Sequence, residues 1–216
     1  MDVIEIGRDE SGYPAALDAC LGSRAPETVA ALGNLDILKE STLALFCSIK
    51  CPGKLILETY HLADRLRAAG VGVISGFHSP MERECLVKLL RGFQPLILCP
   101  ARSIASMRIP AGFKRPLEQG RLLLLSPFGG KQHRATAEMA LYRNRFVAAL
   151  ADRIFVAYAD PGGKTEHFCR DVIGWNKPLY ALDSQENANL LALGARPIRP
   201  ESAPQLLGEG QKESPE

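Results

Sequence analysis

Short apolar runs alternate along the chain with longer amphipathic stretches. From residue 42 onward, six runs of four to six residues are almost entirely apolar, over 42–47, 71–74, 95–99, 121–125, 153–157 and 178–182. Such runs are typical of strands that are buried on both faces of a parallel sheet. Between the runs, apolar residues recur at helical spacing, as at Leu55, Leu62 and Leu66. The alternation predicts a three-layer, doubly wound α/β fold whose mostly parallel sheet has about six or more strands.

The segments that flank this pattern predict a division of the chain into three parts. Residues 1–41 carry Pro14, Pro26 and several small residues, and we expect a lead-in that packs on the core, with one short helix over 26–32. Residues 42–199 form the α/β domain. Residues 200–216 contain three prolines, two glycines and four glutamates, which is typical of a disordered tail.

The composition indicates an ordinary globular protein that stays in the cytoplasm. Of the 216 residues, 46% are hydrophobic and 23% are charged, which excludes collagen-like, coiled-coil and wholly disordered classes. No apolar run approaches the ~18 residues that span a bilayer, and the N-terminus lacks the pattern of a secretory signal. The six cysteines include no CxxC pair, so we expect buried thiols. We predict no disulfide, no metal site, no cofactor and no membrane partner.

Basic residues gather in one part of the chain. Between Arg102 and Arg145 there are nine Lys or Arg residues and two acidic residues, although the formal net charge of the whole chain is +2. Such a segment in a near-neutral chain indicates an anionic partner.

Four turns that follow predicted strands are rich in glycine, serine and lysine, at 47–54, 75–80, 126–131 and 160–165. In an open parallel sheet, ligands bind beyond the carboxyl ends of the strands. Glycine there lets a phosphate approach the backbone and the free N–H groups of the next helix. None of the turns matches GxGxxG or GxxxxGK[ST], so the sequence predicts neither a standard dinucleotide site nor a P-loop.

The turns and the basic segment together give a set of candidate phosphate-binding residues. The set comprises Ser48, Lys50, Ser75, Gly76, Lys131, Arg134, Arg143, Asn144, Arg145, Gly162, Gly163, Lys164 and Thr165. On one continuous helix, Arg143 and Arg145 are about 200° apart and cannot both face one phosphate. If Asn144 instead caps a new helix, both guanidinium groups lie near its N-terminus and form a phosphate clamp. Phe77 or Phe128 then stacks on a base or packs against its own loop.

No arrangement of residues predicts catalysis. The four histidines have no Ser or Cys nucleophile motif around them, and GxSxG does not occur. Ser79 and Glu82 match a capping box at the start of a helix, which accounts for that carboxylate. We therefore assign no catalytic residue, and the sequence indicates a binding site.

Four motifs occur in the order that is found in one known family. They are Tyr-Pro-Ala-Ala-Leu at 13–17, Gly-Val-Gly-Val-Ile-Ser-Gly at 70–76, Tyr-Arg-Asn-Arg-Phe at 142–146 and Gly-Gly-Lys-Thr at 162–165. Together they resemble the DprA/Smf family of DNA-processing proteins. The resemblance implies a Rossmann-like fold that binds single-stranded DNA in a basic pocket, forms a homodimer and acts without catalysis. It also implies a RecA-type recombinase as a partner, which the protein helps to load onto DNA during natural transformation.

Two departures from the family pattern indicate a short, divergent branch with the Rossmann-like core alone. Cys47-Ser48-Ile49 stands where the family has G-[ST]-R, so Lys50 would have to replace the arginine. We also expect no winged-helix domain of the kind that many members carry after the Rossmann-like core.

A second resemblance keeps an enzyme or a nucleotide sensor open as the alternative. Residues 161–166, PGGKTE, are similar to the PGGxGTxxE motif of the cytokinin-activating phosphoribohydrolases, which share this general fold. The third glycine is absent, and Glu166 follows the threonine directly instead of three residues later.

Overall fold

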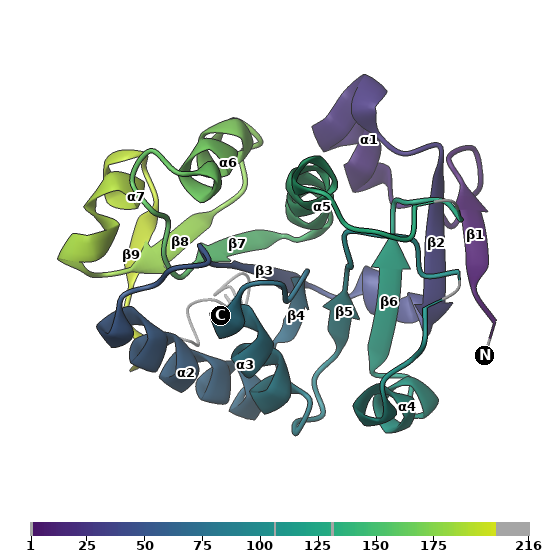
Figure 1. The fold of residues 1–216 in the computed structure, drawn as a ribbon, viewed down its shortest axis with the longest axis horizontal. Coiled ribbons are helices and arrows are strands. Elements are labelled where there is room, and N and C mark those ends of the chain that lie inside the picture. Colours follow the sequence, from purple (N-terminus) through teal and green to yellow (C-terminus); the bar gives the residue numbers. More distant parts are fainter. Residues whose placement is uncertain (1, 106, 131, 202–216) are drawn as a thin grey trace, which may run out of the picture.

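The computed structural model describes residues 2–105, 107–130 and 132–201, and in this part of the chain one nine-stranded sheet runs through the molecule (Figure 1). The strands are β1 (Ile4–Gly7), β2 (Thr28–Gly33), β3 (Thr42–Phe46), β4 (Gly72–Ser75), β5 (Leu96–Leu98), β6 (Leu122–Ser126), β7 (Arg153–Val156), β8 (Leu179–Leu182) and β9 (Arg196–Ile198). The helices are α1 (Ala15–Leu21), α2 (Gly53–Ala68), α3 (Pro80–Leu89), α4 (Ala111–Glu118), α5 (Ala137–Leu150), α6 (Lys164–Ile173) and α7 (Ala188–Ala192). Short 3₁₀ turns occupy Gly22–Arg24, Leu35–Lys39 and Gln185–Asn187.

The order of the strands is that of a doubly wound sheet. It reads β1-β2-β6-β5-β4-β3-β7-β8-β9. From β6 to β9 every neighbouring pair is parallel, whereas β2 pairs antiparallel with both β1 and β6. The chain moves outward from β3 through β4 and β5 to β6, and then returns through α5 to β7 on the other side of β3. The order therefore reverses between β3 and β7, which is where doubly wound folds bind ligands.

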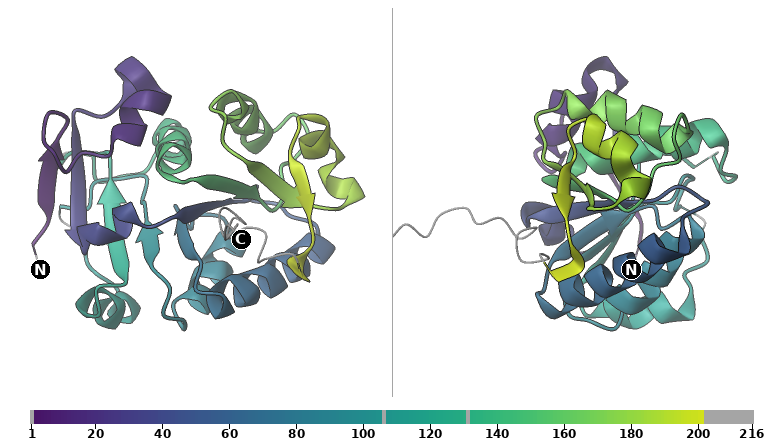
Figure 2. Two further views of the ribbon diagram at one scale, coloured as in Figure 1. Left: turned by 180° about the vertical axis from the view of Figure 1, so that it is seen from behind. Right: turned by 90° about the vertical axis from the view of Figure 1, so that its left-hand side faces the viewer.

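Helices cover both faces of the sheet, as the end-on view of Figure 2 shows. Helices α2, α3 and α4 pack on one face, and α1, α5, α6 and α7 pack on the other. Alternate residues of β3 enter the two cores, with Leu43 and Leu45 on the α2 side and Ala44 and Phe46 on the α5 side. All of β3 is buried, which explains why its sequence lacks polar alternation. The predicted three-layer α/β fold is confirmed.

The six strands predicted from apolar runs are confirmed as β3 to β8, but the predicted helix over 26–32 is wrong. This segment forms β2, and the sheet therefore begins before residue 42. Val29 is buried in one core and Leu32 in the other, so packing on both faces decides the conformation. Gly33, at φ +122°, allows β2 to lie close to β6, since a Cβ there would be 2.4 Å from the carbonyl oxygen of Leu122.

The predicted tail lies mostly outside the described residues, which end at Glu201. Within the described residues, no helix is both long and apolar enough to cross a membrane.

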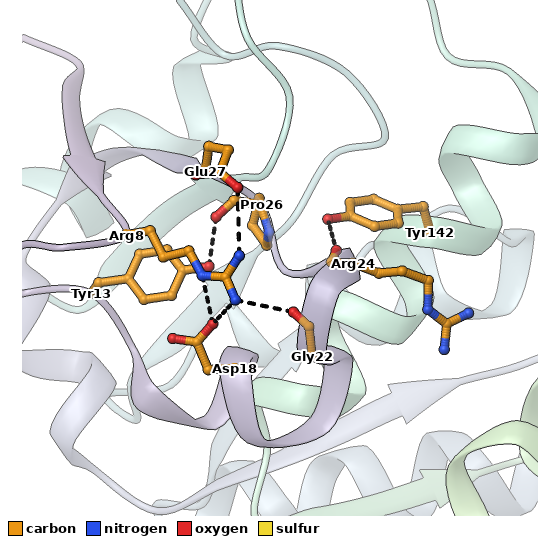
Figure 3. A network of polar contacts seen from close by, with 8 residues as sticks. All are labelled: Arg8, Tyr13, Asp18, Gly22, Arg24, Pro26, Glu27 and Tyr142. Atoms are coloured by element: carbon orange, nitrogen blue, oxygen red, sulfur yellow. Dashed lines mark hydrogen bonds and ion pairs between the residues drawn. The ribbon is translucent and has the colours of Figure 1, made fainter.

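An arginine ties the N-terminal segment together (Figure 3). Arg8 forms ion pairs with Asp18 of α1 and with Glu27, which precedes β2. It also donates a hydrogen bond to the carbonyl oxygen of Gly22 at 3.1 Å. These contacts fix α1 relative to the antiparallel pair of β1 and β2.

Two tyrosines from the motifs at 13–17 and 142–146 complete this network (Figure 3). The Tyr13 hydroxyl donates to the carbonyl oxygen of Pro26 at 2.6 Å, and burial raises the pKa of Tyr13 to about 12. The Tyr142 hydroxyl of α5 donates to the carbonyl oxygen of Arg24 at 2.8 Å. The Tyr13 and Tyr142 motifs are thus joined in space, and they position α5 over the sheet.

Candidate functional site

A cavity of about 340 Å³ opens at the carboxyl ends of β3, β4 and β5, beside the point where the strand order reverses. Its walls come from the loops after these strands, from the first turn of α3, from the first two turns of α5 and from the first turn of α6. The lining residues with nitrogen or oxygen in their side chains are His78, Ser79, Glu82, Thr136, Arg143, Asn144, Lys164 and Thr165. The structure thus brings together four of the predicted site residues: Arg143, Asn144, Lys164 and Thr165.

Arg143 is a buried cation in the wall of this cavity. Its residue surface is 3% exposed, and its Nη1 donates to the carbonyl oxygen of Cys99, just after β5, at 2.8 Å. Its Nε donates to Oδ1 of Asn144 at 2.9 Å. Among the described residues, no carboxylate is hydrogen-bonded to this guanidinium. Burial lowers the pKa of Arg143, but an arginine stays charged in proteins, so the site holds a positive charge without a bonded anion.

Gly76 is the residue that makes room for this cation. A Cβ at position 76 would lie 1.4 Å from Nη1 of Arg143, so the guanidinium lies directly against the backbone after β4. We predicted that glycine in this turn admits a phosphate. In the structure, the guanidinium group of Arg143 occupies this space instead.

Arg145 does not join Arg143. Helix α5 is continuous from Ala137 to Leu150 with Thr136 as its N-cap, so the alternative in which Asn144 caps a new helix is wrong. Arg145 leaves the other side of the helix and forms an ion pair with Asp171 of α6. The phosphate clamp of two arginines is therefore not formed, as the 3.6-residue turn of a helix requires.

The predicted serines are turned inward and shape the loops. Ser75 is fully buried, and its hydroxyl donates to the carbonyl oxygen of Leu45 and accepts from the N–H of Phe77. The Ser48 hydroxyl donates to Oγ1 of Thr165 at 3.0 Å and accepts from the N–H of Asp160 at 3.0 Å. Ser48 thereby joins the loops after β3 and β7, on the two sides of the reversal point.

The two phenylalanines considered for base stacking are buried. Phe77 is 5% exposed and Phe128 is 6% exposed. Phe128 packs against the ring of Tyr142, with 5.8 Å between the ring centroids. Both therefore pack within the protein, and neither ring is open to a base.

The loop after β7 is held by its own contacts. Gly162 has φ +71°, a conformation that favours glycine, and a Cβ at Gly163 would lie 2.8 Å from the carbonyl oxygen of Asp160. These glycines serve the turn, and neither lines the cavity, whereas the following Lys164 and Thr165 do. The loop thus presents the first turn of α6 to the cavity.

Glu166 is buried beneath this loop. Its carboxylate accepts hydrogen bonds from the N–H of Gly162 at 3.1 Å, from Arg170 at 2.6 Å and from Asn189 at 2.6 Å. These bonds, led by that of Asn189, lower the pKa of Glu166 to about 2. Glu166 is not among the residues that line the cavity.

The predicted capping box of Ser79 and Glu82 is confirmed, and Glu82 does more than cap α3. Its Oε1 accepts from the N–H of Cys47 at 2.8 Å, and its Oε2 accepts from the N–H of His78 at 2.7 Å. The buried carboxylate therefore joins the loops after β3 and β4. The negative charge of Glu82 acts through space to raise the pKa of Arg143. Arg143 and Lys164 are positive and Glu82 is negative, so the charged residues of the cavity lining are net positive.

The remaining predicted residues lie outside the cavity lining. Lys50 and Arg134 are exposed, and Lys131 lies outside the described residues. His78 and Thr136 line the cavity but were not predicted. Thr136 is of a residue type that caps helices, and its hydroxyl accepts from the N–H of Met139, whereas His78 lies in the predicted turn over 75–80 but was not chosen from it.

Comparisons with known proteins place this chain in a family. The sequence model described as DNA recombination-mediator protein A matches residues 5–203. No curated protein sequence gives a match. Among solved structures, DNA processing protein A (DprA) from Streptococcus pneumoniae has a TM-score of 0.78 at 19% identity, over 97% of this chain and 75% of that chain.

Two further structures share the fold. DNA processing protein A from Helicobacter pylori, described for its unique single-stranded DNA binding mode, has a TM-score of 0.76 at 20% identity, over 95% of this chain and 95% of that chain. A molybdenum cofactor binding protein from Rippkaea orientalis has a TM-score of 0.54 at 10% identity, over 78% of this chain and 95% of that chain. The Rossmann-like fold is thus confirmed, and because the family match spans nearly the whole chain, this protein belongs to the DNA recombination-mediator protein A family, the DprA/Smf family of DNA-processing proteins.

Proposed function

We propose that this chain binds single-stranded DNA in the cavity at the carboxyl ends of β3, β4 and β5, and that it does so without catalysing a reaction. The observation that carries the proposal is Arg143, whose hydrogen bonds go to uncharged oxygens and whose charge lines the cavity. A DNA phosphate is the anion that the family supports, since the Helicobacter pylori relative is described as binding single-stranded DNA.

Two helix N-termini add to the positive potential of the cavity. Thr136 and Ala137 begin α5, and Lys164 and Thr165 begin α6, and all four residues line the cavity. The free N–H groups and partial positive charge of a helix N-terminus favour phosphate. Lys164 is exposed and has no ion pair among the described residues, so its ammonium group is available to a second phosphate.

The hydrolase alternative finds no support in the position of its glutamate. Glu166 is bound by three hydrogen-bond donors and does not line the cavity. A general acid or base must reach the proton that it transfers. We therefore keep the proposal to binding.

The proposal extends to a homodimer and to the loading of a RecA-type recombinase during natural transformation. These two parts rest on membership of the family alone.

The fluorescence anisotropy of a labelled oligothymidylate, titrated with protein at two salt concentrations, tests the proposal. We expect binding that weakens steeply as salt rises, because Lys and Arg contacts to phosphate release counterions. Lys164→Gln should weaken binding about five-fold, the loss of one charge-assisted contact. Arg65→Gln removes an exposed arginine of α2 that does not line the cavity, and it should leave the affinity unchanged. An absence of binding at low salt, or equal affinities of these two variants, would refute the proposal.

A further inference from the structure

A second basic surface lies at the amino ends of the strands, opposite the end at which the cavity opens. The connection from α3 to β5 and the connection from α4 to β6 border a groove of about 390 Å³ at the amino ends of β5 and β6. In Figure 1 both connections lie at the lower edge of the sheet, beside α4. The charged lining residues are Arg91, Arg115 and Arg121, and the described lining contains no acidic residue.

Among the described residues, these three arginines have no acidic partner. Arg91 and Arg115 are exposed, and within the described chain neither side chain forms an ion pair or a hydrogen bond. Arg121 is partly buried, with Nη2 donating to the carbonyl oxygen of Leu90 at 2.8 Å and Nε donating to Gln119 at 3.0 Å. Its Nη1 is shielded from solvent and has no hydrogen-bond partner among the described residues.

Two of these charges are close enough to act on each other. Burial and then the nearby charge of Arg115 lower the pKa of Arg121. Like charges that gather without a carboxylate repel each other, and an anion in the groove would relieve that repulsion.

A phenylalanine stands open to solvent beside the arginines. Phe93 is 90% exposed, the highest value among the large hydrophobic residues described. The turn that carries it is fixed, because Gln94 donates to the carbonyl oxygen of Leu89 at 2.8 Å, and a Cβ at Gly92 would lie 2.1 Å from Oε1 of Gln94. An aromatic ring held next to guanidinium groups is the combination on which proteins stack the bases of single strands.

We propose that this groove is a second binding site for the same single-stranded nucleic acid, with phosphates at Arg91, Arg115 and Arg121 and a base on Phe93. The inference rests on the proposed function, because it takes the strand that occupies the cavity as the ligand. The groove and the cavity lie at opposite ends of β5, whose three residues at ~3.3 Å each set a minimum separation of about 10 Å, so an oligonucleotide must exceed this length to reach both.

The dependence of affinity on oligonucleotide length tests the second site separately from the first. The groove variant combines Phe93→Ala with Arg115→Gln. Its matched control combines Leu57→Ala with Arg65→Gln, which removes a 62% exposed apolar side chain and an exposed arginine from α2. For thymidine oligomers of about 6 nucleotides we expect equal affinities, and for about 30 nucleotides we expect the groove variant to bind about five- to ten-fold more weakly than the control. Thermal melting of each variant establishes that it is folded.

A local probe reports on stacking at Phe93 itself. The native chain has one tryptophan, Trp175. Phe93→Trp adds an indole in the groove, and Leu57→Trp adds one on α2 as the control. The long oligomer should quench the fluorescence of Phe93→Trp and leave that of Leu57→Trp at the level of the native chain.

The outcomes separate the two sites. If short oligomers bind but the groove variant and its control bind the long oligomer equally, the second site is refuted and the cavity stands. If neither oligomer binds the native chain, the proposed function fails and the second site fails with it. A third outcome combines two observations: polyglutamate displaces the long oligomer, and the oligomer does not quench the fluorescence of Phe93→Trp. The surface then binds acidic polymers in general, and the proposal is overturned.

Discussion

Replacing Gly76 by alanine perturbs the cavity through a single contact. The backbone of Gly76 does not have a positive φ, so alanine is compatible with the main chain. Its Cβ, however, would lie 1.4 Å from Nη1 of Arg143, well inside any permitted contact. The guanidinium must therefore leave the carbonyl oxygen of Cys99, which it meets at 2.8 Å.

The lost contact sets the size of the effect. A hydrogen bond from a charged donor to a buried acceptor contributes about 1.5 to 3 kcal/mol, and some repacking adds to this, so we expect Gly76→Ala to lower the free energy of unfolding by about 2 to 4 kcal/mol. Urea denaturation measures this loss. Gly53→Ala, where a Cβ would meet nothing within 4 Å, is the matched control and should change stability by less than about 1 kcal/mol.

A double-mutant cycle gives the sharper test. In an Arg143→Ala background the obstructing guanidinium is gone, so adding Gly76→Ala should cost less than about 1 kcal/mol. If Gly76→Ala costs the same with and without Arg143, the contact does not explain the glycine and the reasoning is refuted.

Three other substitutions test the contacts that hold the site in place. Because the folded pKa of Glu166 is about 2 against an ordinary 4.5, its stabilisation is complete above about pH 4.5 and is lost as pH falls towards 2. Glu166→Gln should therefore lower the free energy of unfolding by about 2 to 3 kcal/mol at pH 7 and weaken its dependence on pH between 4.5 and 2. The same pH dependence in the variant and the native chain would contradict the lowered pKa. Lys177 donates to three carbonyl oxygens at the end of α5, so Lys177→Met should lower the free energy of unfolding by about 1 to 3 kcal/mol in urea denaturation. An unchanged free energy would show that these hydrogen bonds do not stabilise the end of the helix. Tyr13→Phe leaves the carbonyl oxygen of Pro26 without its donor and should lower stability by about 1 to 2 kcal/mol, whereas a loss below about 0.5 kcal/mol would show that water replaces the hydroxyl.

The strands could be predicted where burial on both faces of the sheet produces an uninterrupted apolar run in the sequence. Residues 122–125 are four leucines, and burial of β6 on both faces accounts for them. β2 was missed because the segment VAAL suits a helix equally well, and its pairing with β6 decides the matter. β1 carries a short alternation of Ile4 and Ile6, of which Ile6 is buried and Ile4 is 46% exposed. A pattern of four residues is too short to separate a strand from a loop.

The sequence indicated the position of the cavity better than the directions in which its side chains point. The glycine- and lysine-rich turns were expected at the carboxyl ends of the strands, and the cavity opens at this end because parallel strands end there together. The direction of a side chain depends on where its helix packs, so the sequence did not show that Arg143 faces the cavity and Arg145 faces α6. For the same reason Gly76 was assigned to a ligand, whereas its neighbour in space is a residue of α5.

The location of the bound strand is the central claim, and photo-cross-linking measures it most directly. An oligonucleotide that carries 5-bromodeoxyuridine is irradiated in complex with the native chain, and the cross-linked peptides are identified by mass spectrometry. We predict cross-links to His78, which is exposed in the cavity wall, and to the first turns of α5 and α6. An oligonucleotide that binds tightly but leaves all three of these segments free of cross-links would contradict the account.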